Sequence, residues 1–204
     1  MSREELVEKI QNLRFISISL DELLTLEYND LYLIYMANKS LKYYDGLKKQ
    51  HLISGITMVN EDHTRLSLWK MGYEDIIKIY LKEFNLTPSK FKGMILSSVE
   101  NFKTVARENN DEEYLSFTSD EMIIASGVLI PDSETVQNLK ESKLKKDIAD
   151  LEETLEIDEG RLKDCSPFEE AEIYGDISYD ADRLRKKEEQ LATLMEEYQN
   201  NIRR

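Results

Sequence analysis

Two long stretches near the end of the chain carry apolar side chains at alternating steps of four and three residues. Asp158 interrupts the first stretch, whose apolar positions are Leu144, Ile148, Leu151, Leu155 and Leu162. Glu188 interrupts the second, whose apolar positions are Ile177, Ala181, Leu184, Leu191, Met195, Tyr198 and Ile202. A repeat of 3.5 residues held over this length is typical of a coiled-coil seam. The pattern predicts two long helices that form an antiparallel coiled-coil hairpin over residues 132–204.

The turn of this hairpin is expected at residues 163–176, which contain Pro167 and Gly175. Folding the chain about this turn pairs Leu162 with Ile177, Leu155 with Leu184, Ile148 with Leu191 and Leu144 with Met195. A slip of seven residues would match the heptads equally well, so the predicted register depends on the length of the turn.

Residues 1–131 show the signs of a separate helical body. A Ser or Thr followed three residues later by Glu, the spacing of a capping box, occurs at Ser2, Ser19 and Thr118. The whole chain has only 7 Gly and 3 Pro, which disfavours sandwiches and barrels because their many turns need these residues. We therefore expect an all-α protein, with a helical body at 1–131 and the hairpin at 132–204.

Tyrosines crowd the early part of this body. A single long helix is expected from Asn29 or Asp30 to Gly55, which would end it. Some of the tyrosines lie off its apolar stripe and should reach the surface, where Tyr is typical of protein-binding patches. In the alternative they close a small helical core; the residues are Tyr28, Tyr32, Tyr35, Tyr43 and Tyr44.

The net charge of −14 is concentrated in one part of the chain. Residues 147–182 hold 14 acidic side chains against Arg161 and Lys163, whereas residues 1–110 are neutral overall. Such a field repels nucleic acids and membrane surfaces and attracts basic partners. The plainer interpretation is a solvated surface that only keeps the chain soluble.

The segment 166–174 combines this charge with apolar side chains. Acidic groups accelerate the encounter with a basic surface, and apolar anchors then hold the complex. We predict that a short acidic helix there binds a partner protein with a basic surface through Phe168, Glu169, Glu170, Glu172, Ile173 and Tyr174. In the alternative, the apolar side chains fold back and close the end of the hairpin.

Residues 75–95 show the pattern of a helix-turn-helix unit. One helix ends near Phe84, a short turn follows, and Pro88 opens a second helix. Asn85 stands where such turns often use Gly, and residues 61–110 carry a net charge of only +1, which gives little non-specific affinity for DNA. Direct contact with nucleic acid is therefore not expected; if it occurs, it would involve Lys78, Lys82, Ser89, Lys90 and Lys92.

No residue pattern supports catalysis, a cofactor or a metal site. The two histidines, His51 and His63, have no further ligands at metal spacing, and no Ser has an evident base. Cys165 is the only cysteine, so the chain cannot form a disulfide framework of its own. The start lacks the apolar core of a signal peptide, and no stretch approaches the ~18 apolar residues of a membrane span. We expect a non-enzymatic cytoplasmic protein that does not contact membranes.

These observations favour a protein that acts by binding another macromolecule. The first hypothesis is an acidic protein that regulates or inhibits a partner by docking on its basic, nucleic-acid-binding surface. Small acidic proteins that block or redirect transcription machinery, including virus-encoded ones, fit this description as a class. The second is a DNA-binding transcriptional regulator that uses residues 75–95 and forms a homodimer through the hairpin. The third is a structural assembly subunit whose hairpins bundle between copies.

Overall fold

The computed structural model describes residues 1–163 and 165–202, and the side chains of these residues except 167, 168, 201 and 202. Every regular element in these ranges is an α-helix, which confirms the all-α prediction. The helices divide into two compact units, Met1–Asp132 (unit 1) and Ser133–Arg204 (unit 2).

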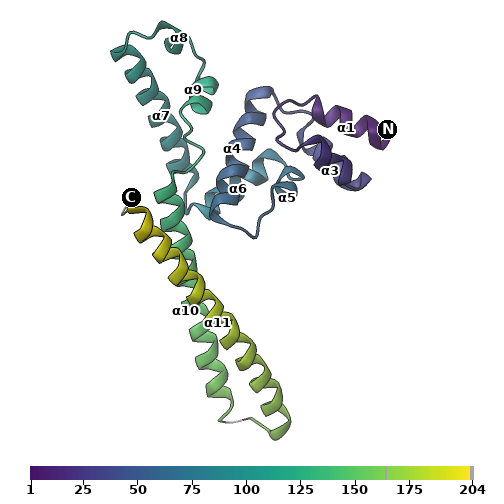
Figure 1. Cartoon of the computed structure of the whole chain (residues 1–204), viewed down its shortest axis with the longest axis vertical. Helices are drawn as coiled ribbons and strands as arrows, with labels where there is room; N and C mark the ends of the chain where they lie inside the picture. The colour runs from purple at the N-terminus through teal and green to yellow at the C-terminus, as the bar shows by residue number, and fades with distance from the viewer. Residues whose placement is uncertain (164, 203–204) are drawn as a thin grey trace. The chain divides into compact units, whose positions relative to one another are not determined.

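Nine helices lie in the described residues of unit 1 (Figure 1). They are α1 (Arg3–Gln11), α2 (Leu20–Thr25), α3 (Tyr28–Asn38), α4 (Tyr43–Val59), α5 (Arg65–Trp69), α6 (Tyr73–Glu83), α7 (Pro88–Glu108), α8 (Glu112–Leu115) and α9 (Ser119–Ala125).

Polar caps start most of these helices. Ser2 and Thr118 form complete capping boxes with the Glu three residues later. The side chains of Ser19, Thr64 and Thr87 each accept a hydrogen bond from the backbone three residues on. Local sequence therefore places these helix starts correctly.

The prediction of a single helix from Asn29 or Asp30 to Gly55 is wrong, because this stretch forms two helices and the second continues past Gly55. The chain breaks after Asn38, whose side chain bonds the backbone carbonyl of Ile34, and α4 starts afresh at Tyr43. Asn competes in this way for backbone groups and favours helix ends. Gly55 does not end α4. A Cβ there would lie 3.0 Å from the Tyr80 ring, so glycine permits a close approach of other elements.

The core of unit 1 forms around α4, which contacts α5, α6 and α9, while α1 contacts α2 and α3 (Figure 1). Its side chains come from nearly every helix, as expected for one continuous core. Those with almost no exposed surface include Leu6, Ile10, Leu23, Leu31, Ile34, Leu52, Ile53, Ile56, Leu68, Trp69 and Ile76.

Two polar side chains, Asn38 and Lys49, lie fully buried in this core. Asn38 donates hydrogen bonds to the carbonyls of Ile34 (2.6 Å) and Trp69 (2.9 Å). The Lys49 Nζ donates to the Asn38 Oδ1 (2.6 Å) and to the Met71 carbonyl (2.6 Å). The ammonium also lies 5.3 Å from the centre of the Trp69 ring. This network joins the end of α3, the middle of α4 and the end of α5.

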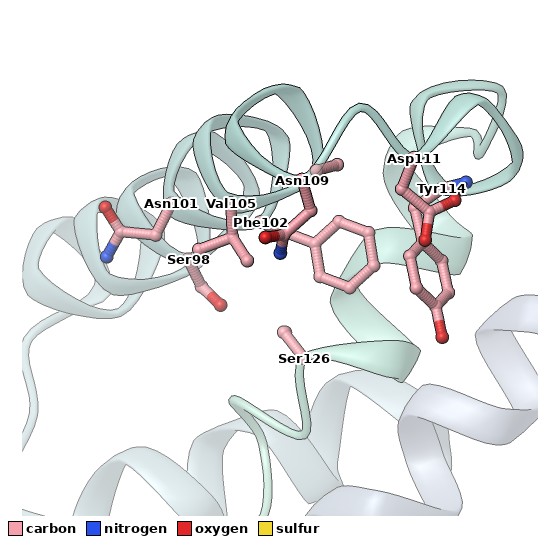
Figure 2. Close-up of a pocket in the computed structure, with 9 residues that line it drawn as sticks. Ser98, Asn101, Phe102, Val105, Asn109, Asp111, Tyr114 and Ser126 are labelled. Atoms are coloured by element: carbon pink, nitrogen blue, oxygen red, sulfur yellow. Dashed lines mark hydrogen bonds between the residues drawn. The ribbon is translucent and has the colours of Figure 1, made fainter.

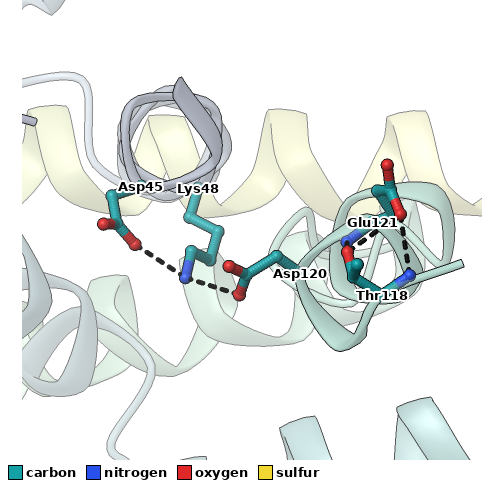
Figure 3. Close-up of polar contacts among 5 residues, drawn as sticks. All are labelled: Asp45, Lys48, Thr118, Asp120 and Glu121. Atoms are coloured by element: carbon teal, nitrogen blue, oxygen red, sulfur yellow. Dashed lines mark hydrogen bonds and ion pairs between the residues drawn. The ribbon is translucent and has the colours of Figure 1, made fainter. Parts of the chain in front are cut away.

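A second polar network attaches α9 to α4 (Figure 3). Lys48 lies between two carboxylates, 2.9 Å from Asp45 and 3.1 Å from Asp120. The Tyr44 hydroxyl donates a hydrogen bond to Glu121, the residue that also completes the capping box of α9. These contacts hold the residues before the unit boundary on the core.

Unit 2 consists of α10 (Ser133–Arg161) and α11 (Pro167–Ile202), which pack side by side (Figure 1). The Gln137 Nε2 donates to the Leu194 carbonyl (3.3 Å), and Lys187 forms an ion pair with Asp147 (2.9 Å). Early residues of one helix thus contact late residues of the other, so the two helices run antiparallel.

The turn predicted at residues 163–176 is too long. Helix α11 already begins at Pro167 and continues through Gly175, because the Ser166 backbone and hydroxyl both donate to Glu169 and cap its first turn. The predicted pairing of Leu144 with Met195 is therefore wrong. The contacts of Gln137 with Leu194 and of Asp147 with Lys187 fit the alternative register, slipped by one heptad.

Candidate functional site

Residues 150–176, which we call the acidic end, surround the connection between α10 and α11. Their basic side chains are Arg161 and Lys163, and Arg161 forms an ion pair with the buried Asp158 (2.8 Å). Nine carboxylates of this segment are exposed: Asp150, Glu152, Glu153, Glu156, Glu159, Glu169, Glu170, Glu172 and Asp176.

None of these nine exposed carboxylates forms an ion pair with another side chain of the described ranges. Several carboxylates elsewhere in unit 2 are paired instead, since Asp147, Asp180 and Asp182 each lie close to a Lys or Arg. The charge of the acidic end is therefore directed to solvent rather than neutralised within the fold.

The predicted contact residues of this segment have different surroundings. Ile173 is only 3% exposed, so it cannot serve as an exposed anchor and instead helps to close the end of unit 2. Tyr174 is 56% exposed, and Glu170 and Glu172 are also exposed. The side chain of Phe168 lies outside the described residues.

Glu169 belongs to the cap of α11. Its carboxylate accepts hydrogen bonds from the Ser166 hydroxyl (2.7 Å) and backbone N–H (3.0 Å). These bonds hold the pKa of Glu169 below its ordinary value. Glu169 therefore stays ionised while fixing the start of the helix that presents Glu170, Glu172 and Tyr174.

A shallow hollow of about 450 Å³ opens at the acidic end, and its lining combines apolar, acidic and basic groups. Ile157 is 57% exposed at this hollow. The acidic and apolar pattern of residues 166–174 did not indicate Ile157, although this residue lies one position before Asp158, a seam position of the heptad repeat. The lining residues are Ile157, Gly160, Arg161, Cys165, Glu169 and Ile173.

The predicted helix-turn-helix unit corresponds to α6, a tight corner and α7. Asn85 adopts a left-handed backbone conformation (φ 49°), and the Leu86 N–H donates to the Leu81 carbonyl (2.8 Å). This is the hydrogen bond of a Schellman motif, and Asn is the residue that best replaces Gly there. The five proposed DNA-contact side chains, Lys78, Lys82, Ser89, Lys90 and Lys92, are all exposed.

The charge of this corner is partly neutralised. Lys78 forms an ion pair with Asp75 (2.9 Å) on the same helix. Hydrogen bonding to Asp75 raises the pKa of Lys78. The free cationic groups available for phosphate contacts are thereby reduced.

A second hollow of about 360 Å³ lies between α7, α8 and the end of α9 (Figure 2). Phe102 and Tyr114 turn their rings towards it, and these rings pack edge to face, 5.5 Å apart. Asp111, its one carboxylate, caps α8 by accepting from the Tyr114 N–H (3.1 Å). The lining therefore suits apolar contact and offers no acid–base pair; it comprises Ser98, Asn101, Phe102, Val105, Ala106, Asn109, Asp111, Tyr114 and Ser126.

The crowded tyrosines lie at the surface or are half-buried, and none of them is in the core. Tyr28 and Tyr32 are exposed on α3 with their rings stacked 6.3 Å apart. Tyr35 lies beside Lys9 and Lys39, and Tyr44 is held by Glu121. The expectation that some of these tyrosines reach the surface is therefore confirmed.

In the part of the chain that the structure describes, no three His, Cys, Asp or Glu side chains are grouped closely enough to hold a metal ion. None of the described helices is long and apolar enough to cross a membrane. Comparison with models of protein families, with curated proteins and with solved structures found no match.

Proposed function

We propose that this chain is a non-enzymatic acidic protein that regulates or inhibits a partner by docking its acidic end on a basic surface of that partner. The observation that carries the proposal is the set of nine exposed carboxylates without ion pairs inside the described fold. Charges left unpaired on one surface act together on a partner, because the Debye length is about 8 Å at physiological salt.

The hollow of the acidic end supplies the second half of this contact. Ile157 offers exposed apolar surface at this hollow, which the Glu169 carboxylate also lines. A Lys or Arg side chain of the partner buries its aliphatic stem on such a surface while its charged head stays near carboxylates. Tyr174 adds an exposed aromatic anchor next to this position.

Proteins that bind nucleic acids are the class of partner with the densest Lys and Arg surfaces. The acidic end would compete there with phosphates, as in regulators of transcription machinery. In this proposal α10 and α11 form an antiparallel coiled-coil hairpin that serves as a rigid support, with Leu151 and Leu184 in its seam. Unit 1 remains available for other contacts.

The test compares proteins captured from the source cell by wild-type chain and by two variants of equal charge. The first variant carries Glu156→Gln, Glu170→Gln and Glu172→Gln at the acidic end. The control carries Glu188→Gln, Glu196→Gln and Glu197→Gln, three exposed residues elsewhere in unit 2. A partner lost only by the first variant supports the proposal. Equal capture by both variants contradicts it.

A DNA-binding regulator is the second candidate, because all five lysine and serine side chains named at the α6–α7 corner are exposed. We expect no binding to random duplex DNA at physiological salt, since residues 61–110 net only +1. Saturable micromolar binding in a mobility-shift assay would reverse this ranking. Lys90→Ala with Lys92→Ala should then weaken the binding.

A further inference from the structure

Helix α3 is apolar on two opposite faces. Leu31 and Ile34 are buried in the core of unit 1, yet Tyr28, Tyr32 and Met36 are large, exposed and spaced by four residues on the other side. Leu33 is exposed beside them, and Leu24 at the end of α2 is exposed as well. A helix that is apolar all round normally buries both faces, and a contiguous exposed patch of this kind marks a contact with a protein.

The charges around this outward face are ordered along the helix. Tyr28 donates a hydrogen bond to the Met1 carbonyl, while Lys9 lies 5.8 Å from the Tyr35 ring, so α1 runs parallel to α3 beside it. The start of α3 is therefore flanked by the exposed acids Glu4, Glu5 and Glu27. These acids outnumber Arg3, whose guanidinium donates to the carbonyls of Leu24 and Leu26 in the same region.

The other end of the same face is basic. The ammonium groups of Lys39 and Lys9 lie 5.9 and 5.8 Å from the centre of the Tyr35 ring, so both lysines are near the end of α3. Lys42, also exposed, follows before α4, and together these lysines outnumber Glu8. The outward face of α3 is therefore acidic at its start, apolar in its middle and basic at its end.

We propose that this outward face of α3 binds a second copy of the same chain, with the two α3 helices packed antiparallel about a twofold axis. A twofold axis brings the same patch of both copies together, so the patch must complement itself. In an antiparallel pair, the acidic start of α3 in one copy lies against the basic end of α3 in the other, and the two helix dipoles are aligned favourably. Tyr32 of each copy then faces the Met36 side of the other, a favourable sulfur–aromatic pairing.

The distribution of charge also places self-association in unit 1. Residues 1–60 carry a net charge of −1, whereas residues 132–204 carry −9. Two copies therefore repel each other through unit 2 but not through α3. A contact made by one helix face of each copy is small, so the dimer should dissociate at micromolar concentrations.

Sedimentation equilibrium at about 1 to 200 μM chain tests this proposal across the micromolar range of dissociation constants. The weight-average mass of the wild type should rise from 23.9 kDa towards twice that value as concentration increases. Tyr32→Arg with Leu33→Arg should keep the chain monomeric. The matched control is Leu96→Arg with Val105→Arg, two α7 residues that are 56% and 55% exposed, and it should dimerise like the wild type.

A charge exchange tests the antiparallel arrangement. Glu27→Lys alone or Lys39→Glu alone places like charges opposite each other and should weaken the dimer, by ~3- to 10-fold in Kd. The double variant restores opposite charges across the interface and should recover wild-type dimerisation. A wild-type chain that stays monomeric throughout the concentration range overturns the proposal, as does dimerisation unaffected by the two α3 arginines. Failure of the double variant to recover binding overturns the antiparallel packing.

Discussion

Lys48 and Lys49 are neighbours in sequence with opposite surroundings. The Lys48 ammonium reaches two carboxylates near the surface, whereas Lys49 is fully buried beside Trp69 and bonds only neutral oxygens. A pair of lysines normally predicts exposure, because Lys is rarely buried. The carbonyl ends of α3 and α5 converge on position 49, and this convergence depends on tertiary packing that no local pattern encodes.

The buried lysine should make stability depend on pH. Burial lowers the pKa of Lys49 to about 8, whereas a lysine in the unfolded chain has a pKa near ~10.4. Between these values the unfolded state binds more protons, so the free energy of unfolding should rise as pH rises from 8. In Lys49→Met this rise should be lost, on top of a loss of ~1–3 kcal/mol for the unpaired oxygens of Asn38 and Met71.

Urea unfolding between pH 7 and 9.5 measures this difference before tyrosine titration interferes. Burial raises the pKa of Tyr80 to about 12, so its opposite effect begins only near pH 10. Lys48→Met is the control. Partial burial acts to lower its pKa, yet the hydrogen bonds to Asp45 and Asp120 hold that pKa above its ordinary value, so Lys48 adds no rise in this window. Parallel pH profiles for wild type and Lys49→Met would show that Lys49 is not desolvated.

At the scale of elements, caps were the most reliable guide. Capping boxes at Ser2 and Thr118 and the cap at Thr87 mark helix starts because the hydrogen bonds are local. The predicted helix ends and the predicted register were wrong where they depend on packing against a segment distant in sequence. Gly55 looks like a helix end, yet it lies inside α4 against Tyr80. The heptad register was equally ambiguous, and the Ser166 cap resolved it by shortening the turn.

Two helix-interior glycines should respond oppositely to the same substitution. A Cβ at Gly46 in α4 would lie 2.3 Å from the Phe15 ring, and Phe15 is buried. Gly93 in α7 has no atom within 4 Å of an added Cβ. Gly46→Ala should therefore destabilise unit 1 by several kcal/mol through overpacking, whereas Gly93→Ala should stabilise it by up to ~1 kcal/mol through helix propensity. Thermal unfolding of the two variants checks both signs, and stabilisation by Gly46→Ala would contradict the packing of Phe15.

The seam between α10 and α11 can be tested in the same way. Leu151 is buried, whereas Leu191 is only half-buried in the observed register. Leu151→Ala should lower the free energy of unfolding of unit 2 by ~2–5 kcal/mol, and Leu191→Ala by less. Met195→Ala, an exposed position, serves as the control and should have little effect. Equal effects of all three substitutions in circular-dichroism melts would indicate that the helices pair in another register.

On the scale of the whole molecule, charge and exposed apolar surface are separated along the chain. The acidic end holds unpaired carboxylates in unit 2, while the exposed face of α3 lies in the nearly neutral residues 1–60. The sequence predicts the first feature through simple charge counting. It predicts the candidate anchors less well, because Ile173 is buried and Ile157 is exposed although both are apolar and belong to the same segment. Which side of a helix faces its neighbour depended on the register, and the register depended on one cap.

Binding kinetics with a captured partner separate the two parts of the acidic end. Charge acts mainly before contact, so Glu156→Gln, Glu170→Gln and Glu172→Gln together should lower the association rate and reduce its dependence on salt. Apolar anchors act after contact, so Ile157→Ala or Tyr174→Ala should instead raise the dissociation rate, by ~5- to 30-fold for a loss of ~1–2 kcal/mol. Tyr179→Ala, an exposed aromatic outside the acidic end, should leave both rates unchanged. If the glutamine variant and the anchor variants all keep wild-type rates, the acidic end is only a solvated surface, and the partner must bind elsewhere on the chain.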